Sequence, residues 1–570
     1  MQVNNTISSS IKKTLIIILI SIVTFMFFIS RPVVFEPSGD ALFNLISAGV
    51  FGNDNEYVLF SNIILGFLLK YLYILIPKIN WYLWLMLISE LVSLISVSYA
   101  ITRKCNLINT ILLSTIINLF IGGECFTDVQ FTVAAMICSS SGLMLISVGM
   151  EDKSKGMKCS GVLLYFLGFL WRTECAIMVL PFFIAWILIK LLSGKRKVLS
   201  IGIIAVTLLL CLSAYAFNHM AYSRGEWKQY TEHSYYRAAI IDHTPVFYIP
   251  GVYDEIGVTE AEADYFRNWY FADPDKMPLS KLKDLYNLQY SGGDYSLRIS
   301  VDVLRKTFLA VKACVKERIF PWLYIMTFFV SIIVGVLSKN KKMIMLMLAS
   351  VGMIMGIYWY FICINRVVWR VEIGAWLAGL LIIIPDTLDC ISNICNTVQE
   401  KLTERINSSL RRVYTIVSYV LIGFISLRLV YGYISVRNTD RYSDYENYYE
   451  LFDGLKDRDG LYLGSLMVGS LRIYDSPYGI DGTYKGLFSN YVQYGGIVYW
   501  AGFNVDKLYA NDIYNPTTAL FERDDVYYIS YDWEADNLLD YLHKEYDENI
   551  YVEKIDEWKD VSIWKYKRSK

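Results

Sequence analysis

Two carboxylates stand at the edges of apolar runs, where each could cap a helix or take part in a reaction. Asp40 lies in "PSGDALF", shortly after the first apolar run, and Asp128 lies in "CFTDVQF", directly before another run. Such a carboxylate can accept the N–H groups of a helix's first turn, or it can act as a general base that takes the proton of a reacting hydroxyl. The sequence leaves both interpretations open for Asp40 and favours the cap for Asp128.

Three arginines interrupt apolar sequence. Arg172 lies in "LGFLWRTECAIMVLP", and Arg366 and Arg370 lie four residues apart in "FICINRVVWRVEIGAW". Residues four apart share one face of a helix, and guanidinium groups match the oxygens of a phosphate. The three arginines are therefore candidates to bind a phosphate. Alternatively, Arg172 could pair with Glu174, and the other two could reach along the apolar surface toward water.

Four more charged residues could line a cleft beside these groups. Asp54 and Glu56 lie in "GNDNEY", and Arg237 and Asp242 lie in "YYRAAIIDH". The first pair is expected on the rim of a cleft that has Asp40 at its floor. The second pair could line the cleft or form an ion pair within its own loop. All four are candidates for contact with an acceptor substrate.

The sequence lacks the motifs of several other classes of protein. It contains no CxxC pair, no HExxH, no GxxxxGK[ST], no GxSxG and no GxGxxG after a strand. His219, His233 and His243 fit no metal-binding spacing and are interpreted as ordinary loop residues. The net charge of −1 provides no basic field for nucleic acid. A divalent metal ion at the outer carboxylates stays open, without an assigned ligand set.

The elements that must position these residues are apolar helices. The chain is 55% hydrophobic and 19% charged, with a mean hydropathy of +0.37. A helix needs ~20 apolar residues to cross the hydrocarbon core of a bilayer. We therefore predict a polytopic α-helical membrane protein with about eleven spanning helices. They are expected at 14–30, 81–101, 107–123, 129–149, 159–175, 176–193, 198–217, 318–337, 343–362, 371–386 and 413–432.

Lysines and arginines in short loops predict the orientation, because such loops favour the cytoplasmic side. The lysines before the first run place the N-terminus inside, and Arg103 and Lys104 must then also face inside. The N-terminus and Arg103 can both face inside only if the apolar run 59–77 does not cross the membrane. Residues 40–77 are therefore expected to form helices on the outer face. The prediction is a multi-pass protein of the plasma membrane with a cytoplasmic N-terminus.

This topology divides the chain into a membrane domain, 1–432, and an extracytoplasmic C-terminal domain, 433–570. The membrane domain includes a first outer loop, 31–80, and a large outer loop, 218–317. In the C-terminal domain, "GLYLGSL" and "DDVYYISY" are strand-like and "EADNLLDYLHKEY" is helical. A hairpin is expected around "EWKD". These patterns predict a small α/β domain.

The order of these features resembles the GT-C superfamily of membrane glycosyltransferases, especially the protein O-mannosyltransferase and aminoarabinose transferase type. "SGDALFNLISAG" is similar to the acidic motif of that family's first loop, although Ala41 stands where the motif has a second acid. "CFTDVQFTVAAM" resembles the segment in which an Asp opens the fourth span. "LGFLWRTECAIMVLP" resembles a Gly-rich helix that ends in Thr-Lys-Gly, with Arg172 in place of the lysine.

The resemblance implies a membrane enzyme that takes a sugar from a polyprenyl-phosphate-linked donor. Asp40 would be the general base of an inverting transfer to a glycan, lipid or protein acceptor, and Asp128 would be a second catalytic carboxylate on the same face. Arg172, Arg366 and Arg370 would hold the lipid phosphate. Some members of the family use a divalent metal ion and others do not. The alternatives are a transporter or flippase of lipid-linked saccharides, a polysaccharide polymerase or ligase, and a non-catalytic surface protein.

Overall fold

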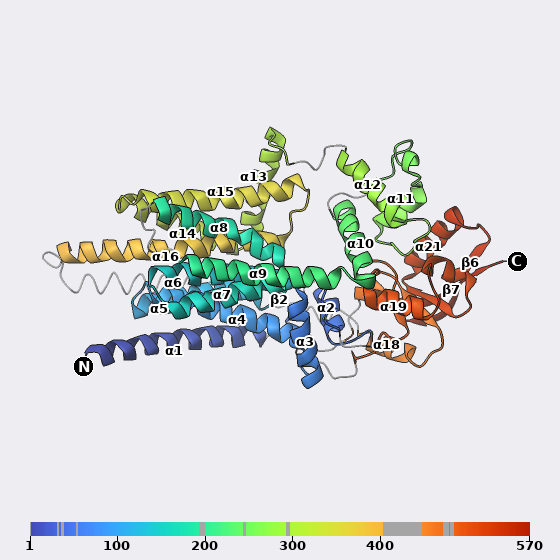
Figure 1. The fold of residues 1–570 in the computed structure, drawn as a ribbon, viewed down its shortest axis with the longest axis horizontal. Coiled ribbons are helices and arrows are strands. Elements are labelled where there is room, and N and C mark those ends of the chain that lie inside the picture. Colours follow the sequence, from blue (N-terminus) through green and yellow to red (C-terminus); the bar gives the residue numbers. More distant parts are fainter. Residues whose placement is uncertain are drawn as a thin grey trace.

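A computed structural model describes residues 2–30, 33–35, 39–52, 55–192, 200–242, 247–291, 297–402, 447–470, 473, 478 and 484–569. A long helical bundle carries a domain with a β-sheet at one end, and the N-terminus lies at the other end (Figure 1). We call these the domain end and the N-terminal end of the bundle.

Nine of the described helices are long and apolar enough to cross a membrane, which supports the prediction of a membrane-embedded helical protein. The predicted number of eleven is not reached in these ranges. The seventh helix, α7 (Lys155–Trp171), has 17 residues, so at ~1.5 Å per residue it falls short of the ~30 Å hydrocarbon core. The run 413–432 lies outside the described residues. The nine helices are α1 (Gln2–Ile29), α4 (Trp81–Thr102), α5 (Leu107–Cys125), α6 (Phe131–Glu151), α8 (Thr173–Leu192), α9 (Ile201–Tyr222), α14 (Phe320–Leu337), α15 (Lys341–Cys363) and α16 (Trp369–Leu402).

Polar side chains begin several of these helices. Asn80 caps α4, Asn106 caps α5 and Asn340 caps α15, each through a side-chain oxygen that accepts a backbone N–H of the first turn. Such a cap satisfies one of the N–H groups that a first turn leaves without an intrahelical partner. The caps explain where these apolar runs become helical.

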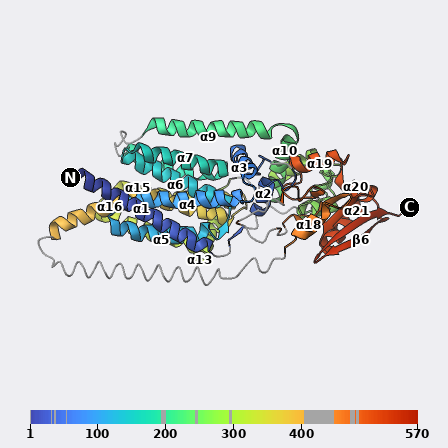
Figure 2. The same cartoon turned by 90° about the horizontal axis from the view of Figure 1, so that it is seen from below.

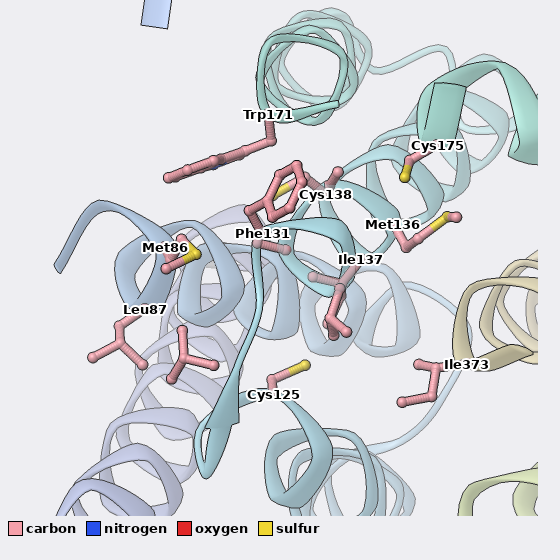
Figure 3. Packing of buried hydrophobic residues seen from close by; sticks show 14 of the residues in the cluster. Met86, Leu87, Cys125, Phe131, Met136, Ile137, Cys138, Trp171, Cys175 and Ile373 are labelled. Atoms are coloured by element: carbon pink, nitrogen blue, oxygen red, sulfur yellow. The ribbon is translucent and has the colours of Figure 1, made fainter. Parts of the chain in front are cut away.

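Helix α6 is the centre of the bundle, and its whole apolar length is buried. Glycines let α7 approach it closely, as is common between membrane helices. A Cβ on Gly168 of α7 would lie 2.2 Å from Oγ of Ser139, and one on Gly142 of α6 would lie 2.7 Å from the carbonyl oxygen of Gly161. Figure 3 shows the side chains that surround α6 near the domain end, among them Met86, Leu87, Cys125, Trp171, Cys175 and Ile373.

The outward faces of the bundle are apolar. Leu15 is 61% exposed, and Leu209 and Leu212 on α9 are 68% and 66% exposed. Figure 2 shows α9 at the edge of the bundle. Large apolar surfaces of this kind are costly in water, so their exposure is further support for a membrane-embedded protein.

The run 59–77 does not extend along the bundle. Lys13 of α1 donates to the carbonyl oxygen of Cys105, just beyond α4, so the start of α1 lies beside the end of α4. The end of α1 and the start of α4 therefore lie together at the domain end. Between them in sequence are two short helices, α2 (Asp40–Ser47) and α3 (Ile63–Leu75), which lie between the bundle and the sheet domain (Figure 1).

The C-terminal segment forms a five-stranded sheet in the order β4-β3-β5-β7-β6. Strand β3 pairs in parallel with β4 and β5, whereas β7 is antiparallel to β5 and β6. The two predicted strands, the predicted helix and the predicted hairpin are all confirmed. The elements are α18 (Tyr449–Leu455), β3 (Leu461–Gly464), β4 (Tyr491–Gln493), α19 (Gly502–Ala510), α20 (Pro516–Glu522), β5 (Val526–Ser530), α21 (Asp532–Glu545), β6 (Ile550–Trp558) and β7 (Val561–Arg568).

The large outer loop packs against this sheet instead of standing alone. Its helices α10 (Gly225–Ile241), α11 (Glu260–Arg267) and α12 (Leu279–Ser291) share one hydrophobic core with the strands. Phe266 and Leu285 from the loop are buried in the same cluster as Leu463 and Tyr528 from the sheet. A further helix, α13 (Val301–Glu317), leads back to the bundle. The predicted domain limits themselves stay predictions.

The first outer loop is also bound to the C-terminal segment. The N–H of Gly486 donates to the carbonyl oxygen of Gly49 over 2.9 Å, and the N–H of Phe488 donates to that of Val50 over 2.8 Å. The Phe51 ring stacks on Phe503 with 4.3 Å between ring centres. All three outer segments therefore meet at the domain end.

Candidate active site

A short pair of strands brings the first outer loop to the start of α6. Strand β1 (Val34–Phe35) runs parallel to β2 (Asp128–Val129), with Val34 opposite Asp128. Helix α2 then begins at Asp40 after Gly39, whose φ of 124° is a conformation that favours glycine. A Cβ on Gly39 would also lie 3.1 Å from the Phe43 ring. The position of Asp40 therefore depends on this glycine turn.

Asp40 makes hydrogen bonds to two other helices. Its Oδ1 accepts from the hydroxyl of Tyr82 over 3.0 Å and from the backbone N–H of Phe131 over 3.1 Å. The side chain thus helps to cap α6, whereas the N-cap of its own helix α2 is Gly39. It is 0% exposed. The expectation of an open cleft with Asp40 at its floor is therefore not met in this closed arrangement.

Asp128 is brought near this point but does not cap α6. The N-cap is Gln130, whose Oε1 accepts the N–H groups of Thr132 and Val133 over 2.6 and 3.1 Å. Asp128 is half-buried in β2. The cap that the sequence favours for Asp128 is therefore wrong, because the strand pairing delays the helix until Phe131.

Arg172 lies at the same first turn of α6. Its Nη1 donates to Oγ1 of Thr132 over 2.7 Å, and its guanidinium carbon lies 5.1 Å from the centre of the Phe131 ring. The side chain also lies 3.6 Å from Glu174, which is 76% exposed. Phe131 thus links the two predicted groups, because its N–H contacts Asp40 and its ring contacts Arg172.

The other two arginines are separated. Helix α15 ends at Cys363, and Asn365 adopts a left-handed conformation with φ of 52°, as is common just after a helix. Arg366 therefore lies in a turn, and the prediction that it shares a helix face with Arg370 is wrong. Arg366 pairs with Asp242 of the outer loop over 2.8 Å. Arg370 begins α16, where it and Arg172 both act electrostatically on Cys175.

The remaining predicted cleft residues have different surroundings. Asp54 lies outside the described residues. Glu56 pairs with Lys70 of α3 over 2.8 Å. Asp242 pairs with Arg366 and not directly with Arg237, which is 5% exposed. Burial lowers the pKa of Arg237, and the charge of Asp242 partly offsets this effect.

Sequence reasoning missed Glu90, which lies within α4. It is 0% exposed, and neither of its carboxyl oxygens has a hydrogen-bond partner in the described part of the chain. The charge of Asp40 acts on it, so the two carboxyl groups lie within range of each other's charge. The available signal was a single acid in the apolar run "LISELVSLIS", since an ionisable residue in a membrane helix commonly has a function.

The group of carboxylates best arranged for a metal ion lies at the N-terminal end instead. Oxygens of Glu151, Asp386 and Asp389 lie within 4.8 Å of one another. Lys104 and Lys190 pair with all three, so two ammonium groups already neutralise most of this charge. The described carboxylates at the domain end form no comparable group, and the metal expectation stays a prediction without an assigned site.

Asp40 and Arg172 thus both contact the first turn of α6 at the domain end, where the charge of Asp40 also acts on Glu90 and Arg370 begins α16 close enough to act on Cys175. This region lies beneath the sheet domain, to which three segments of the chain contribute. This combination is suited to moving a proton near an anionic group. Comparison with models of protein families, with curated proteins and with solved structures found no match to this chain.

Proposed function

We propose that this chain is a membrane glycosyltransferase. It would move a sugar from a polyprenyl-phosphate-linked donor to an acceptor hydroxyl at the outer face of the plasma membrane, with inversion. The observation that carries the proposal is the arrangement of Asp40 and Arg172 about Phe131. In this proposal Asp40 is the carboxylate that accepts a proton, and Arg172, which contacts the same phenylalanine, is the cation that stabilises the leaving phosphate.

In this reaction Asp40 takes the proton of the acceptor hydroxyl, and the hydroxyl oxygen of the acceptor attacks the anomeric carbon of the sugar. The bond between that carbon and the phosphate oxygen breaks, and the lipid phosphate leaves as an anion. A positioned base of this kind contributes ~10²–10⁴-fold. Asp40 is closed to solvent, so substrate binding must displace the residues that cover it.

The leaving phosphate needs cations, because the first N–H groups of α6 are already used. Phe131 N–H donates to Asp40, and those of Thr132 and Val133 donate to Gln130. Arg172 and Arg370 are therefore the phosphate-binding candidates. Arg366 is assigned instead to the outer domain through its pair with Asp242. No step is assigned to a metal ion.

The proposed orientation follows from where the basic residues gather. Lys13, Arg103, Lys104 and Lys190 lie together at the N-terminal end, where they contact Cys105, Asp152, Asp389 and Glu151. Basic residues favour the cytoplasmic side of a membrane. The domain end would then face out, where a lipid-linked donor in the outer leaflet can reach it.

Transfer can be measured in membranes that contain the full chain. We expect these membranes to release polyprenyl phosphate from a set of radiolabelled polyprenyl-phosphate hexoses and to pass the label to a glycan, lipid or protein fraction. Membranes without the chain provide the background. If the chain raises neither release nor transfer for any donor of this class, the glycosyltransferase proposal is wrong.

Glu90 supports a second candidate function, a transporter of lipid-linked saccharides. A carboxyl group buried within a helix of the bundle is typical of an ion or proton pathway. In that case liposomes containing the protein would move a fluorescent lipid-linked saccharide between leaflets without breaking its phosphate bond, and Glu90→Gln would slow the movement. Bond cleavage that depends on Asp40 distinguishes the transferase from this alternative.

A further inference from the structure

A cavity lies between the large outer loop and the sheet domain. It has a volume of about 420 Å³ and lies between α10, the segment before α12, and Trp500. This volume is within the ~300–1,000 Å³ of typical small-molecule sites. Lys228, Gln229, Glu232 and His233 line it, and they share one face of α10 because residues three and four apart are neighbours on a helix.

Buried nitrogen atoms without partners in the described residues lie at the inner end of this cavity and in a small hollow behind it. His233 and Arg237 are each 5% exposed, and within the described residues Nδ1 of His233 and Nη1 of Arg237 have no hydrogen-bond partner. The same is true of Nε1 of Trp500. The His233 ring lies flat on the Trp500 indole, with 4.2 Å between centres. Buried polar groups left unpaired are costly, so this wall is suited to a ligand with hydrogen-bond acceptors.

The charges behind this wall favour an anion. A small hollow of about 10 Å³ shares His233 and Trp500 with the cavity and is also lined by Arg237. Asp242 is the carboxylate whose charge acts on Arg237, and it already pairs with Arg366 over 2.8 Å. The carboxylate whose charge acts on the buried Arg237 is thus already engaged by a second arginine. The Arg237 guanidinium is otherwise stacked over Trp269, at 5.3 Å.

The histidine itself adds no charge at neutral pH. Burial, helped by the nearby Lys283, lowers the pKa of His233 to about 4. Its neutral ring can therefore donate or accept one hydrogen bond at Nδ1. At the rim, Lys228 is exposed, and Glu232 lies 3.5 Å from Lys283. The rim consequently presents both donors and an acceptor, which is the mixture that sugar hydroxyls need.

The hollow also adjoins the turn that carries Asp40. Ile497 lines it, and a Cβ on Gly39 would lie 3.5 Å from Cδ1 of Ile497. We propose that the cavity binds a sugar unit that carries a carboxylate or a phosphate, with its anionic group toward Arg237 and its ring beside Trp500. This inference rests on the proposed function in that the sugar would belong to the acceptor.

Binding can be measured without transfer, with the full chain in lipid nanodiscs and saturation-transfer NMR. The probes are D-glucuronate, D-glucose 1-phosphate, D-glucose and inorganic phosphate. We expect at least one anionic sugar to bind tenfold or more tightly than D-glucose and than inorganic phosphate. The tighter of the two anionic sugars identifies the anionic group. Equal binding of glucose and both anionic sugars, or equal binding of inorganic phosphate, overturns the inference.

Variants assign the binding to this cavity. Arg237→Gln should lower the affinity for the anionic sugar at least tenfold and leave the affinity for glucose unchanged. Because Arg237 is buried, Lys228→Gln provides a second variant at an exposed position, with an expected loss of two- to fivefold. Arg523→Gln is the matched control, since Arg523 is a half-buried arginine of the same domain that pairs with Asp525. If Arg237→Gln is folded and binds like the unmodified chain, the inference is wrong.

The outcomes separate this inference from the proposed function. Asp40→Asn should bind the anionic sugar as the unmodified chain does, because the cavity does not include Asp40. A chain that transfers sugar but does not bind any anionic sugar would sink the cavity proposal alone. A chain that binds such a sugar at Arg237 but transfers nothing would leave the cavity assigned and refute the transferase.

Discussion

The two ends of the helical bundle use the same types of charged residue in different ways. At the N-terminal end, Lys104 contacts Asp389 over 2.8 Å and Glu151 over 3.1 Å, and Lys190 contacts Asp386 over 2.7 Å. At the domain end, Asp40 accepts from a hydroxyl and a backbone N–H, and Arg172 donates to a threonine hydroxyl. Short ion pairs join the helices at the N-terminal end. At the domain end neutral groups hold Asp40, and Arg172 has Glu174 as an ionic partner only at 3.6 Å, on a largely exposed side chain.

This difference indicates that the charged residues of the N-terminal end contribute mainly to stability and those of the domain end mainly to catalysis. In a buried ion pair, removing one partner leaves a charge that is costly to keep in the protein. A carboxylate or guanidinium held by neutral groups is oriented by them while its own charge can still act on a ligand. We therefore expect substitutions at the N-terminal end to affect unfolding and substitutions at the domain end to affect turnover.

The largest expected effect is on catalysis by Asp40→Asn. The asparagine oxygen can still accept from Tyr82 and Phe131, so the fold should persist, while the loss of the base should lower transfer by ~10²–10⁴-fold. The measurement is the rate of polyprenyl phosphate release per folded molecule. Asp40→Ala provides the comparison, because it also removes both hydrogen bonds. Full turnover by the folded asparagine variant would falsify the assignment of Asp40 as the base.

Next in size is the effect of Lys190→Met on stability. Lys190 is 7% exposed, and its removal leaves Glu151 and Asp386 without one cation, which is expected to cost about 3–5 kcal/mol of unfolding free energy. Unfolding in mixed micelles with SDS measures this loss. The double variant with Asp386→Leu should recover part of it. A loss of turnover per folded molecule as large as that of Asp40→Asn would remove the distinction between the two ends.

Arg172→Gln should have an intermediate effect, and on turnover. Losing a charge-assisted contact to the leaving phosphate is expected to cost about 1.5–3 kcal/mol, or roughly ten- to a hundredfold in rate. The matched control is Glu174→Gln at the neighbouring, largely exposed position, which should transfer sugar at nearly the normal rate. If Glu174→Gln lowered the transfer rate more than Arg172→Gln does, Arg172 would not be the residue that contacts the leaving phosphate.

Substituting Gly39 or Gly52 by alanine tests whether the turn before Asp40 must keep its conformation. Gly39 and Gly52 have similar φ values of 124° and 113°, but a Cβ has a close neighbour only at Gly39. Either change to alanine is expected to cost about 1–2 kcal/mol of backbone strain. Only Gly39→Ala should also lower turnover, because Phe43 must move and shift Asp40. Equal turnover of the two variants would show that the exact place of Asp40 matters little.

The smallest expected effect is a pH dependence of stability at the domain end. The pKa of His233 is lowered by burial to about 4 in the folded chain, against about 6.5 when unfolded. The unfolded chain therefore binds the extra proton first, and stability is present above pH 6.5 and falls as pH drops toward 4. Between pH 7 and 5.5 the loss is about 1 kcal/mol.

His233→Asn should lack this part of the pH dependence, as measured by unfolding at several pH values. His219→Asn serves as the control at an exposed position and should behave as the unmodified chain does. If the asparagine variant at position 233 keeps the full dependence, another group is responsible.

Local patterns were sufficient for much of the fold. Apolar runs predicted the helices, and the strand-like stretch "DDVYYISY" is present as β5. The basic residues Arg103 and Lys104 predicted that the run 59–77 does not extend along the bundle, and α3 is accordingly short. These features depend on neighbours in the sequence or on the sum of charges in a loop, so they can be recognised without knowing the packing.

The candidate site was only partly predictable. Asp40 and Arg172 were identified from their types and their places beside apolar runs, yet their meeting at Phe131 depends on residues 91 and 40 positions apart. Arg366 and Arg370 have helical spacing, but a left-handed Asn365 places only Arg370 on the helix. His233 fits no motif, and its stacking on Trp500 follows from the docking of two outer segments.

The sequence by itself determined the class of protein, because runs of about twenty apolar residues can be recognised without any knowledge of the fold. It also predicted β3, β5, α21 and the β6–β7 hairpin of the C-terminal segment, but not β4, α18, α19 or α20. Only the tertiary structure decided that Asp40 caps a different helix, that its charge acts on Glu90, and that the large outer loop shares a core with the sheet. Those contacts join residues far apart along the chain, and they depend on side-chain packing that no local pattern contains.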